Sequence, residues 1–594
     1  MENRLYPTWN EIQNFHNPLT EGEESLARFL DDTLPEEWMI FVEPYLNGSR
    51  PDIVVFNPQI GVMIYEVKDW DLSSYHWKGG QLVVGDKKGS YPIKDPEKQV
   101  NHYKDKILGQ LVPSLGEEVD RNKSAFGLVK TGIYFHKMPG EVVRKFFNNR
   151  TYPIIIGYDD LYDSNIRNIV PDSGIPKGKY MQEEWADEIL FWLKPPFHSL
   201  EQTQYFELTP KQKEHAEPQS GHFRIRGATG SGKTLVIAYR AAKLASQGFN
   251  VLVITFNITL WHYIRDMIAR TPFEFEWSKI CFNHFHGFCN DVLNELGVPA
   301  PHEKYLKTIV PTVERALKMA TYRGENVENL KFDAILIDEG QDYKWEWYNC
   351  LCQFLRGRDE LLLVCDKKQN IYSRDLSWID KPMKNFPGRW RELKTVYRLP
   401  KKIGDAANRF SSMFGLDQSV EVEKYVQLKL FERPLKPHLV WINIQSGAWL
   451  SHIKNAYELI ESAQLKSSEG HPSDIVILLP TKSMGMEAAE YFDKSLQIEV
   501  NHVFEDDRES KYHSHKKAFW LGDSRLKMST IHSFKGWEAV HVILLIPEEW
   551  KGLGNLDALV YTAMTRTREN LIVLNCNERY VEYGKSLQSA WDKQ

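Results

Sequence analysis

The feature that most constrains this chain is the glycine-rich segment GATGSGKT, which ends at Thr234. It follows the apolar stretch HFRIR and precedes the helical pattern LVIAYRAAKLASQG. Glycines let backbone N–H groups converge on a phosphate, and the N-terminus of the following helix adds a positive partial charge. We expect Lys233 to reach the β- and γ-phosphates and Thr234 to bind Mg²⁺. The glycines of this expected cradle are Gly227, Gly230 and Gly232.

The chain after about residue 205 alternates apolar strand-like runs with helical stretches. The runs are FRIRG, VLVITF, DAILIDE and LLLVCD, followed by DIVILLP, HVILLI and LIVLN. Near-continuous apolar strands separated by helices are typical of parallel sheets that are covered on both faces. The pattern therefore predicts two α/β lobes of this kind.

Further motifs indicate which reaction the phosphate loop serves. The strand AILIDEGQD ends in adjacent carboxylates, where Asp338 is expected to hold Mg²⁺ and Glu339 to polarise the attacking water. The segment VCDKKQNIY places Gln369 where it can sense the γ-phosphate, and the amide of Gln212 in LTPKQ can pair with an adenine edge. The combination predicts ATP hydrolysis.

From about residue 205 onward the chain resembles a superfamily 1 helicase of the UvrD/Rep type. The resemblance is carried by GATGSGKT, AILIDEGQD, VYRLP, STIHSFKGWEAVHVILL and VYTAMTRTRENLIVL, in that order. It implies two RecA-like lobes that bind ATP between them and translocate 3′ to 5′ along single-stranded nucleic acid. It also implies that Gln212 is the adenine reader, that Gln369 couples the lobes, and that Glu538 contacts the ribose. Arg398 and Arg566 would be arginine fingers that neutralise transition-state charge.

The segments TFNIT and HFHGF match the family motifs that grip a strand and stack its bases. Stacking of a base on an aromatic ring is worth about 1–3 kcal/mol. The alternative for each aromatic residue is an ordinary place in the core. The candidate nucleic-acid contacts are Thr255, Asn257, His286, Phe288, Tyr372 and His532.

Two intervals between motifs are shorter than in the family. About 45 residues separate HFHGF from AILIDE, and about 130 separate VYRLP from STIHSFKG. We expect truncated accessory subdomains there, which affects processive unwinding more than ATP hydrolysis. The predicted domains are 1–200, 201–395 with a small insertion, and 396–594 with a reduced accessory insertion.

The N-terminal segment PDIVVFNPQIGVMIYEVKDW predicts two strands around the turn-forming residues 57–61. If this hairpin is symmetric about position 59, Asp52 lies opposite Glu66, and Lys68 projects from the same face as Glu66. Carboxylates side by side repel unless a divalent cation lies between them, and Mg²⁺ or Mn²⁺ suits such oxygen ligands. The arrangement resembles the P-D…E-x-K site of restriction-endonuclease-like nucleases.

Two flanking elements extend this second resemblance. The amphipathic segment TEGEESLARFLDDTL predicts a helix that offers Glu23 as a further metal ligand, with Glu24 as the alternative. Gln99 and Tyr103, one helical turn apart, resemble the Q-x-x-x-Y element of RecB-type nucleases. A G-E pair on the helix that carries Glu23, then P-D, then E-V-K, resembles the nuclease-related domain family, called NERD. The alternative is a plain hairpin with a surface ion pair between Glu66 and Lys68.

The sequence thus predicts an α/β chain in which a restriction-endonuclease-like domain precedes two RecA-like lobes. The expected function is an ATP-dependent DNA helicase or translocase coupled to a nuclease that uses Mg²⁺ or Mn²⁺. The expected partner is single-stranded or tailed duplex DNA, with RNA as the alternative. The rivals are a helicase with an inactive N-terminal docking domain and an ATP-sensing switch that binds nucleic acid without translocating. Family analogy suggests bacterial DNA repair or phage defence.

Composition fits an intracellular role. The six cysteines include no CxxC pair, the N-terminus carries no apolar signal segment, and no apolar run approaches the ~20 residues that span a bilayer. We therefore expect a cytoplasmic protein that does not associate with a membrane. The net charge of −6 argues against a uniformly basic surface but is compatible with a basic track.

Overall fold

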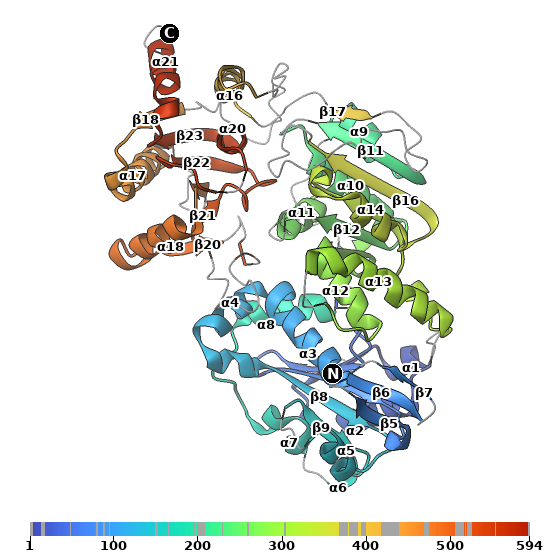
Figure 1. Ribbon diagram of the computed structural model, residues 1–594. Coiled ribbons are helices and arrows are strands. Elements are labelled where there is room, and N and C mark those ends of the chain that lie inside the picture. The colour runs from blue at the N-terminus through green and yellow to red at the C-terminus, as the bar shows by residue number, and fades with distance from the viewer. Residues whose placement is uncertain are drawn as a thin grey trace. The chain divides into compact units, whose positions relative to one another are not determined.

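The computed structural model divides into two compact units, and each is described by itself (Figure 1). One unit comprises Met1–Phe197 with His286–Leu330, and the other comprises His198–Phe285 with Lys331–Gln594. The structure describes residues 4–591 apart from 14–17, 45, 48, 79–80, 87–88, 94, 149–151, 164–165, 195–196, 199–207, 228–229, 258–259, 302–304, 367–377, 379–389, 394–398, 417–438, 468–473, 505–515, 517, 520–524 and 553. The segment 286–330 thus packs with the N-terminal unit, although it lies between TFNIT and AILIDEGQD in the sequence.

The first unit is built on a six-stranded mixed sheet in the order β1-β2-β3-β4-β8-β9. The strands are β1 (Leu5–Tyr6), β2 (Met39–Val42), β3 (Ile53–Asn57), β4 (Gly61–Lys68), β8 (Val129–Phe135) and β9 (Ile154–Gly157). The β3–β4 hairpin pairs Ile53 with Tyr65 and Asn57 with Gly61. This register is symmetric about position 59 and confirms the predicted hairpin. A smaller antiparallel sheet contains β5 (Tyr75–Lys78), β6 (Gln81–Asp86) and β7 (Gly89–Pro92).

Helices cover this sheet on both faces. Helix α2 (Glu21–Thr33) buries Leu26 and Leu30 in a core that also contains Tyr65 and Val67 of β4. Because side chains alternate along a strand, Glu66 points to the opposite face. Helix α3 (Pro96–Lys106) packs on β4 and β8. The other helices of this unit are α1 (Trp9–Ile12), α4 (Pro113–Arg121), α5 (Gly140–Phe146), α6 (Asp160–Asp163), α7 (Ile166–Ile169), α8 (Glu183–Leu193) and α13 (Tyr305–Tyr322), together with α12 (Phe285–Glu295) from its second residue onward.

The second unit contains two six-stranded parallel sheets, which confirms the prediction of two parallel α/β lobes. The first has the order β14-β12-β15-β16-β11-β17, with β11 (Gly221–Gly227), β12 (Val251–Thr255), β14 (Ile280–His284), β15 (Phe332–Ile337), β16 (Leu355–Cys365) and β17 (Arg391–Leu393). The second has the order β18-β23-β22-β19-β21-β20, with β18 (Leu439–Asn443), β19 (Ile475–Leu479), β20 (Val500–His502), β21 (Leu526–Thr530), β22 (Ala539–Ile546) and β23 (Thr567–Asn575).

Helices flank both parallel sheets, as their apolar strands require. The first lobe has α9 (Pro210–Ala216), α10 (Lys233–Ser246), α11 (Leu260–Ala269) and α14 (Trp345–Cys352). The second has α16 (Lys401–Met413), α17 (Trp449–Ser467), α18 (Lys482–Glu490), α20 (Leu556–Met564) and α21 (Val581–Trp591). Among the described residues, none of the helices combines the length and apolar character needed to cross a membrane.

Candidate nucleotide and nuclease sites

The glycine-rich loop joins the end of β11 to the first residue of α10. Gly230 and Gly232 have φ angles of 74° and 84°, in the left-handed region that favours glycine. A Cβ atom at Gly232 would also collide with the side-chain amide of Gln212. The loop is therefore shaped around these glycines, with Lys233 at the start of the helix.

Gln212 lies beside this loop and is 3% exposed. Its Oε1 accepts a hydrogen bond from the backbone N–H of Thr209 at 3.0 Å, in a capping box at the start of α9. Its Nε2 donates to the carbonyl of Ser231 at 3.0 Å. The cap thus fixes the amide against the phosphate loop, in the neighbourhood where an adenine reader is expected.

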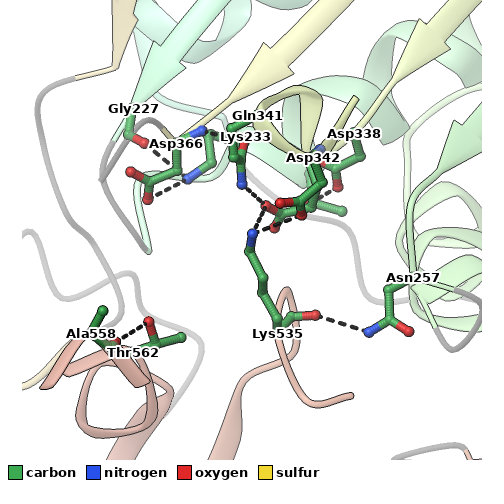
Figure 2. Close-up of polar contacts among 12 residues, drawn as sticks. Gly227, Lys233, Asn257, Asp338, Gln341, Asp342, Asp366, Lys535, Ala558 and Thr562 are labelled. Atoms are coloured by element: carbon green, nitrogen blue, oxygen red, sulfur yellow. Dashed lines mark hydrogen bonds and ion pairs between the residues drawn. The ribbon is translucent and has the colours of Figure 1, made fainter. Parts of the chain in front are cut away.

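Lys233 extends its ammonium group within the loop, as Figure 2 shows. The Nζ donates to the carbonyl of Gly227 at 3.0 Å and lies 3.4 Å from Oδ2 of Asp366. Asp366 follows β16 directly, and its backbone N–H donates to Oε1 of Gln341 at 2.9 Å. The lysine is thus held at the carboxyl edge of the parallel sheet, where α/β folds bind ligands.

Asp338 follows the last residue of β15 and meets the phosphate loop. The Thr234 hydroxyl donates to Oδ2 of Asp338 at 3.0 Å. Burial and the neighbouring Glu339 carboxylate raise the pKa of Asp338 to about 6. A hydroxyl and a carboxylate that converge in a buried place, with repulsion that a cation would relieve, fit a Mg²⁺ ion.

Glu339 adopts a left-handed backbone conformation with φ of 54°, which is uncommon outside glycine. Burial would raise the pKa of its carboxyl, but the charges of Lys535, Lys233 and Arg566 outweigh this effect and lower the pKa. The amide of Gln341 also donates to this carboxylate. Glu339 is therefore an ionised carboxylate that can orient and polarise water.

Lys535 is a site residue that the sequence reasoning missed. Its ammonium is buried, lies 2.7 Å from Oδ2 of Asp342 and 3.8 Å from Oε2 of Glu339, and is drawn in Figure 2. Its place in the STIHSFKGWE motif, between His532 and Glu538, is the sequence signal that could have identified it. The contact brings a cation from the turn between β21 and β22 to the carboxylates that follow β15.

Thr255 and Asn257, which were expected to contact nucleic acid, form hydrogen bonds within the protein. The Nδ2 of Asn257 donates to the carbonyls of Ser533 at 2.7 Å and Lys535 at 3.2 Å. The Thr255 hydroxyl in turn donates to the carbonyl of Asn257 at 2.9 Å. Thr255 and Asn257 therefore help to fix the turn that carries Lys535.

The expectation that Phe288 contacts nucleic acid is wrong. Its side chain is 4% exposed, so it belongs to the core and does not offer a face to a base. The ring centroids of His286 and Tyr305 are 5.7 Å apart. The rings of His532 and Trp550 are stacked, with 6.3 Å between their centroids.

The structure describes only some of the other residues expected at the ATP site. Glu538 Oε2 lies 3.7 Å from Nε of Arg568. Arg566 is buried, and its charge helps to lower the pKa of Glu339. The expected residues Gln369, Tyr372 and Arg398 lie outside the described residues.

The β3–β4 hairpin assembles the candidate nuclease residues. Oδ2 of Asp52 accepts a hydrogen bond from the backbone N–H of Val67 at 2.6 Å. The ammonium of Lys68 donates to Oε1 of Glu66, which is 1% exposed. Oε2 of Glu66 is buried and has no hydrogen-bond partner in the described part of the chain. This pattern is a buried charge cluster, not the surface ion pair that was the alternative.

The charges of this cluster explain its pKa shifts. Burial and the Glu66 carboxylate raise the pKa of Asp52 well above its ordinary value, against the effect of Lys68. Burial lowers the pKa of Lys68, but Glu66 and Asp52 outweigh it, and the net pKa is raised. The unpartnered oxygen of Glu66 and the repulsion at Asp52 fit a divalent cation. Among the described residues, however, no group of three acidic, histidine or cysteine side chains is arranged to hold a metal.

Helix α2 and the end of β2 bring further acidic residues toward this hairpin. The carboxylate of Glu23 accepts a hydrogen bond from the backbone N–H of Thr20 at 2.7 Å and adds to the raised pKa of Asp52. Glu24 instead forms an exposed ion pair with Arg28 at 2.7 Å. Glu43, which the sequence analysis missed, has its pKa raised by burial and by Glu23. Glu23 is thus the glutamate of α2 that acts on the cluster.

Helix α3 supplies the other two expected nuclease residues. Nε2 of Gln99 donates to the Tyr103 hydroxyl at 3.0 Å, and that hydroxyl donates to the carbonyl of Arg50 at 3.3 Å. Oε1 of Gln99 is buried without a hydrogen-bond partner among the residues that the structure describes. Burial, Glu295, Glu66 and Asp52 all raise the pKa of Tyr103, which places the tyrosine close to the carboxylates.

Comparison with known proteins connects these sites to families. The nuclease-related domain matches residues 19–135, an AAA domain matches residues 212–375, and the UvrD-like helicase C-terminal domain matches residues 526–574. The chain is also similar to the ATP-dependent DNA helicase PcrA of Staphylococcus aureus strains Mu50, NCTC 8325 and COL, with 25% identity over 130 residues. This similarity covers 21% of the chain and only 18% of the length of each relative.

Proposed function

We propose that this chain, in which a nuclease-related domain precedes a UvrD-like helicase, uses ATP to move 3′ to 5′ along DNA and cuts DNA with its N-terminal domain. The observation that carries the motor part is the convergence of Lys233, Asp338, Glu339 and Lys535 in one buried site. The fold that holds them is a pair of parallel sheets. The proposed location is the cytoplasm, and the proposed setting is bacterial DNA repair or phage defence.

In the motor, the side chains have separable tasks. Lys233 binds phosphate oxygens, and Thr234 and Asp338 would hold Mg²⁺, which would neutralise phosphate charge when bound. Glu339 orients the attacking water by accepting its hydrogen bond. Arg566 and Lys535 supply positive charge beside Glu339, where hydrolysis needs charge stabilisation.

In the nuclease domain, Asp52 and Glu66 would hold Mg²⁺ or Mn²⁺, which would supply an activated water when bound. Lys68 is held by Glu66 and donates hydrogen bonds toward the scissile phosphate. Gln99, which donates to the Tyr103 hydroxyl, offers its buried amide oxygen as a further polar group. The unpartnered oxygen of Glu66 is the observation that supports this part of the proposal.

Two observations favour the second candidate, an N-terminal domain that only docks DNA. The carboxylate of Glu23 is engaged by its own helix cap, and the described residues show no three-ligand metal group. A two-carboxylate site with a lysine is compatible with either function.

Cleavage and ATP turnover measured on the same preparations test the proposal. Wild type, Lys68→Ala and Lys233→Ala are incubated with labelled single-stranded, duplex and tailed DNA, with and without ATP and with Mg²⁺ or Mn²⁺. We expect metal-dependent cleavage that Lys68→Ala abolishes, and DNA-stimulated ATPase with strand displacement that Lys233→Ala abolishes. Failure of wild type to cut any DNA or RNA form would favour the docking domain. ATPase that no nucleic acid stimulates would favour the switch.

A further inference from the structure

Asp291 of helix α12 contacts two basic side chains of helix α3. Oδ2 of Asp291 accepts a hydrogen bond from Nζ of Lys106 at 2.7 Å, and Oδ1 lies 2.9 Å from Nε2 of His102. His102 and Lys106 are one turn apart on α3, so a single carboxylate spans both. The pair is buried, with side-chain exposures of 13% for Asp291 and 2% for Lys106.

Lys106 also holds the loop that leads to Asp52. Its Nζ donates to the carbonyl of Asn47 at 3.0 Å and to the hydroxyl of Ser49 at 3.1 Å. An ammonium has three donors, and these two bonds together with the bond to Asp291 use all three. Without Asp291 a buried positive charge would lose its counter-charge, and the lysine would no longer be fixed between the helix and the loop.

The same helix α3 ties the loop at a second point and contributes to the candidate nuclease site. The hydroxyl of Tyr103 donates to the carbonyl of Arg50, two residues before Asp52. Burial and then the charge of Glu295, one turn after Asp291 on α12, raise the pKa of Tyr103. Helix α12 therefore acts on α3 at two successive turns.

We propose that Asp291 is a positioning residue of the nuclease site: it fixes Lys106, and through Lys106 it fixes the loop that presents Asp52. This inference rests on the proposed nuclease function. Asp291 lies outside the nuclease-related match at residues 19–135 and inside the AAA match at residues 212–375. The motor part of the sequence thus supplies a support that the nuclease-related segment lacks on its own.

The test compares Asp291→Asn, Asp291→Glu and a matched control in the full chain. The control is Asp172→Asn, which breaks the partly buried ion pair with Lys130. Lys130 is in register with Met63, toward the other end of β4 from Glu66. Cleavage of a single-stranded oligonucleotide with Mn²⁺ is expected to fall by about 10-fold or more in Asp291→Asn, as for other outer-sphere supports of metal sites. Asp291→Glu should recover most of the rate, and Asp172→Asn and the ATPase of all variants should stay close to wild type.

A second measurement does not depend on cleavage. Amide hydrogen exchange of the peptide that contains residues 46–52 reports local opening of the loop. We expect faster exchange in Asp291→Asn, but not in Asp172→Asn. If wild type cuts no DNA, the nuclease proposal fails, and the exchange result alone decides whether Asp291 positions the loop. Unchanged exchange in Asp291→Asn, or an equal increase in Asp172→Asn, would overturn the inference.

Discussion

Lys535 and Asp342, 193 positions apart in the sequence, form a buried ion pair with 2.7 Å between Nζ and Oδ2. The same ammonium lies 3.8 Å from the Glu339 carboxylate. One lysine from the turn between β21 and β22 therefore adds positive charge beside the carboxylates that follow β15.

Replacing Lys535 with Ala should slow ATP hydrolysis by about 100-fold, because loss of a preorganised charge in a buried site typically has an effect of this size. The variant also leaves Asp342 buried without its counter-charge. Steady-state ATPase with saturating DNA measures the loss. Lys551→Ala is the matched control, since Lys551 is 85% exposed and pairs only with Glu549 among the ion pairs found. Wild-type turnover in Lys535→Ala would contradict the assigned role.

Glu339→Gln should abolish ATP turnover while ATP binding is retained, because the amide keeps the shape of the side chain but cannot polarise water as the carboxylate does. Lys233→Ala should lose both binding and turnover, since it removes the phosphate contact. Equilibrium binding of a fluorescent ATP analogue separates the two variants. Equal loss of binding in both would mean that Glu339 acts in nucleotide binding.

Asp52→Ala should abolish metal-dependent cleavage and leave DNA-stimulated ATPase intact. The variant removes one of the two carboxylates that would hold the cation. It also removes the acceptor of the hydrogen bond that the backbone N–H of Val67 donates. The two activities are measured on one preparation whose folding is checked by thermal unfolding. Loss of both activities in a folded protein would show that the sites are coupled more tightly than we propose.

Phe288→Ala should lower the free energy of unfolding by about 3–5 kcal/mol, the usual effect of removing a buried ring. The side chain is 4% exposed, so Phe288→Leu should keep most of the stability and full DNA affinity. Chemical denaturation and DNA binding by fluorescence anisotropy test this. A large loss of DNA affinity in Phe288→Leu, with stability unchanged, would restore the base-stacking interpretation.

Stability of the first unit should depend on pH through Asp291. Burial would raise the pKa of this carboxyl, but Lys106 and His102 outweigh it, and the pKa in the folded protein is lowered. The contribution is therefore present above the unfolded pKa of about 3.9 and lost as the pH falls below it. Asp291→Asn should lower the free energy of unfolding by about 3 kcal/mol at neutral pH, as for other broken buried pairs. The difference from wild type should shrink on acidification in unfolding titrations, and a constant difference would contradict the assignment.

Local patterns made the main elements predictable. The Asn57–Gly61 turn sets the register of its own hairpin, and so the approach of Asp52 to Glu66 follows from the consecutive residues 52–66 alone. The glycines of the phosphate loop likewise fix a conformation that few other residues adopt. Alternating apolar strands and helices were sufficient to predict two parallel sheets, because only that arrangement covers such strands on both faces.

Local sequence was therefore sufficient to predict the glycine-rich loop, the adjacent carboxylates, the hairpin with its E-x-K and the order of the motifs. It did not predict that Lys535 reaches Asp342, that Asp291 is bound by Lys106, or that Phe288 is buried. The difference lies in the range of the interactions. A turn or a loop is specified by interactions between near neighbours, whereas a buried ion pair between residues 185 or 193 positions apart exists only once separate elements have packed and excluded water.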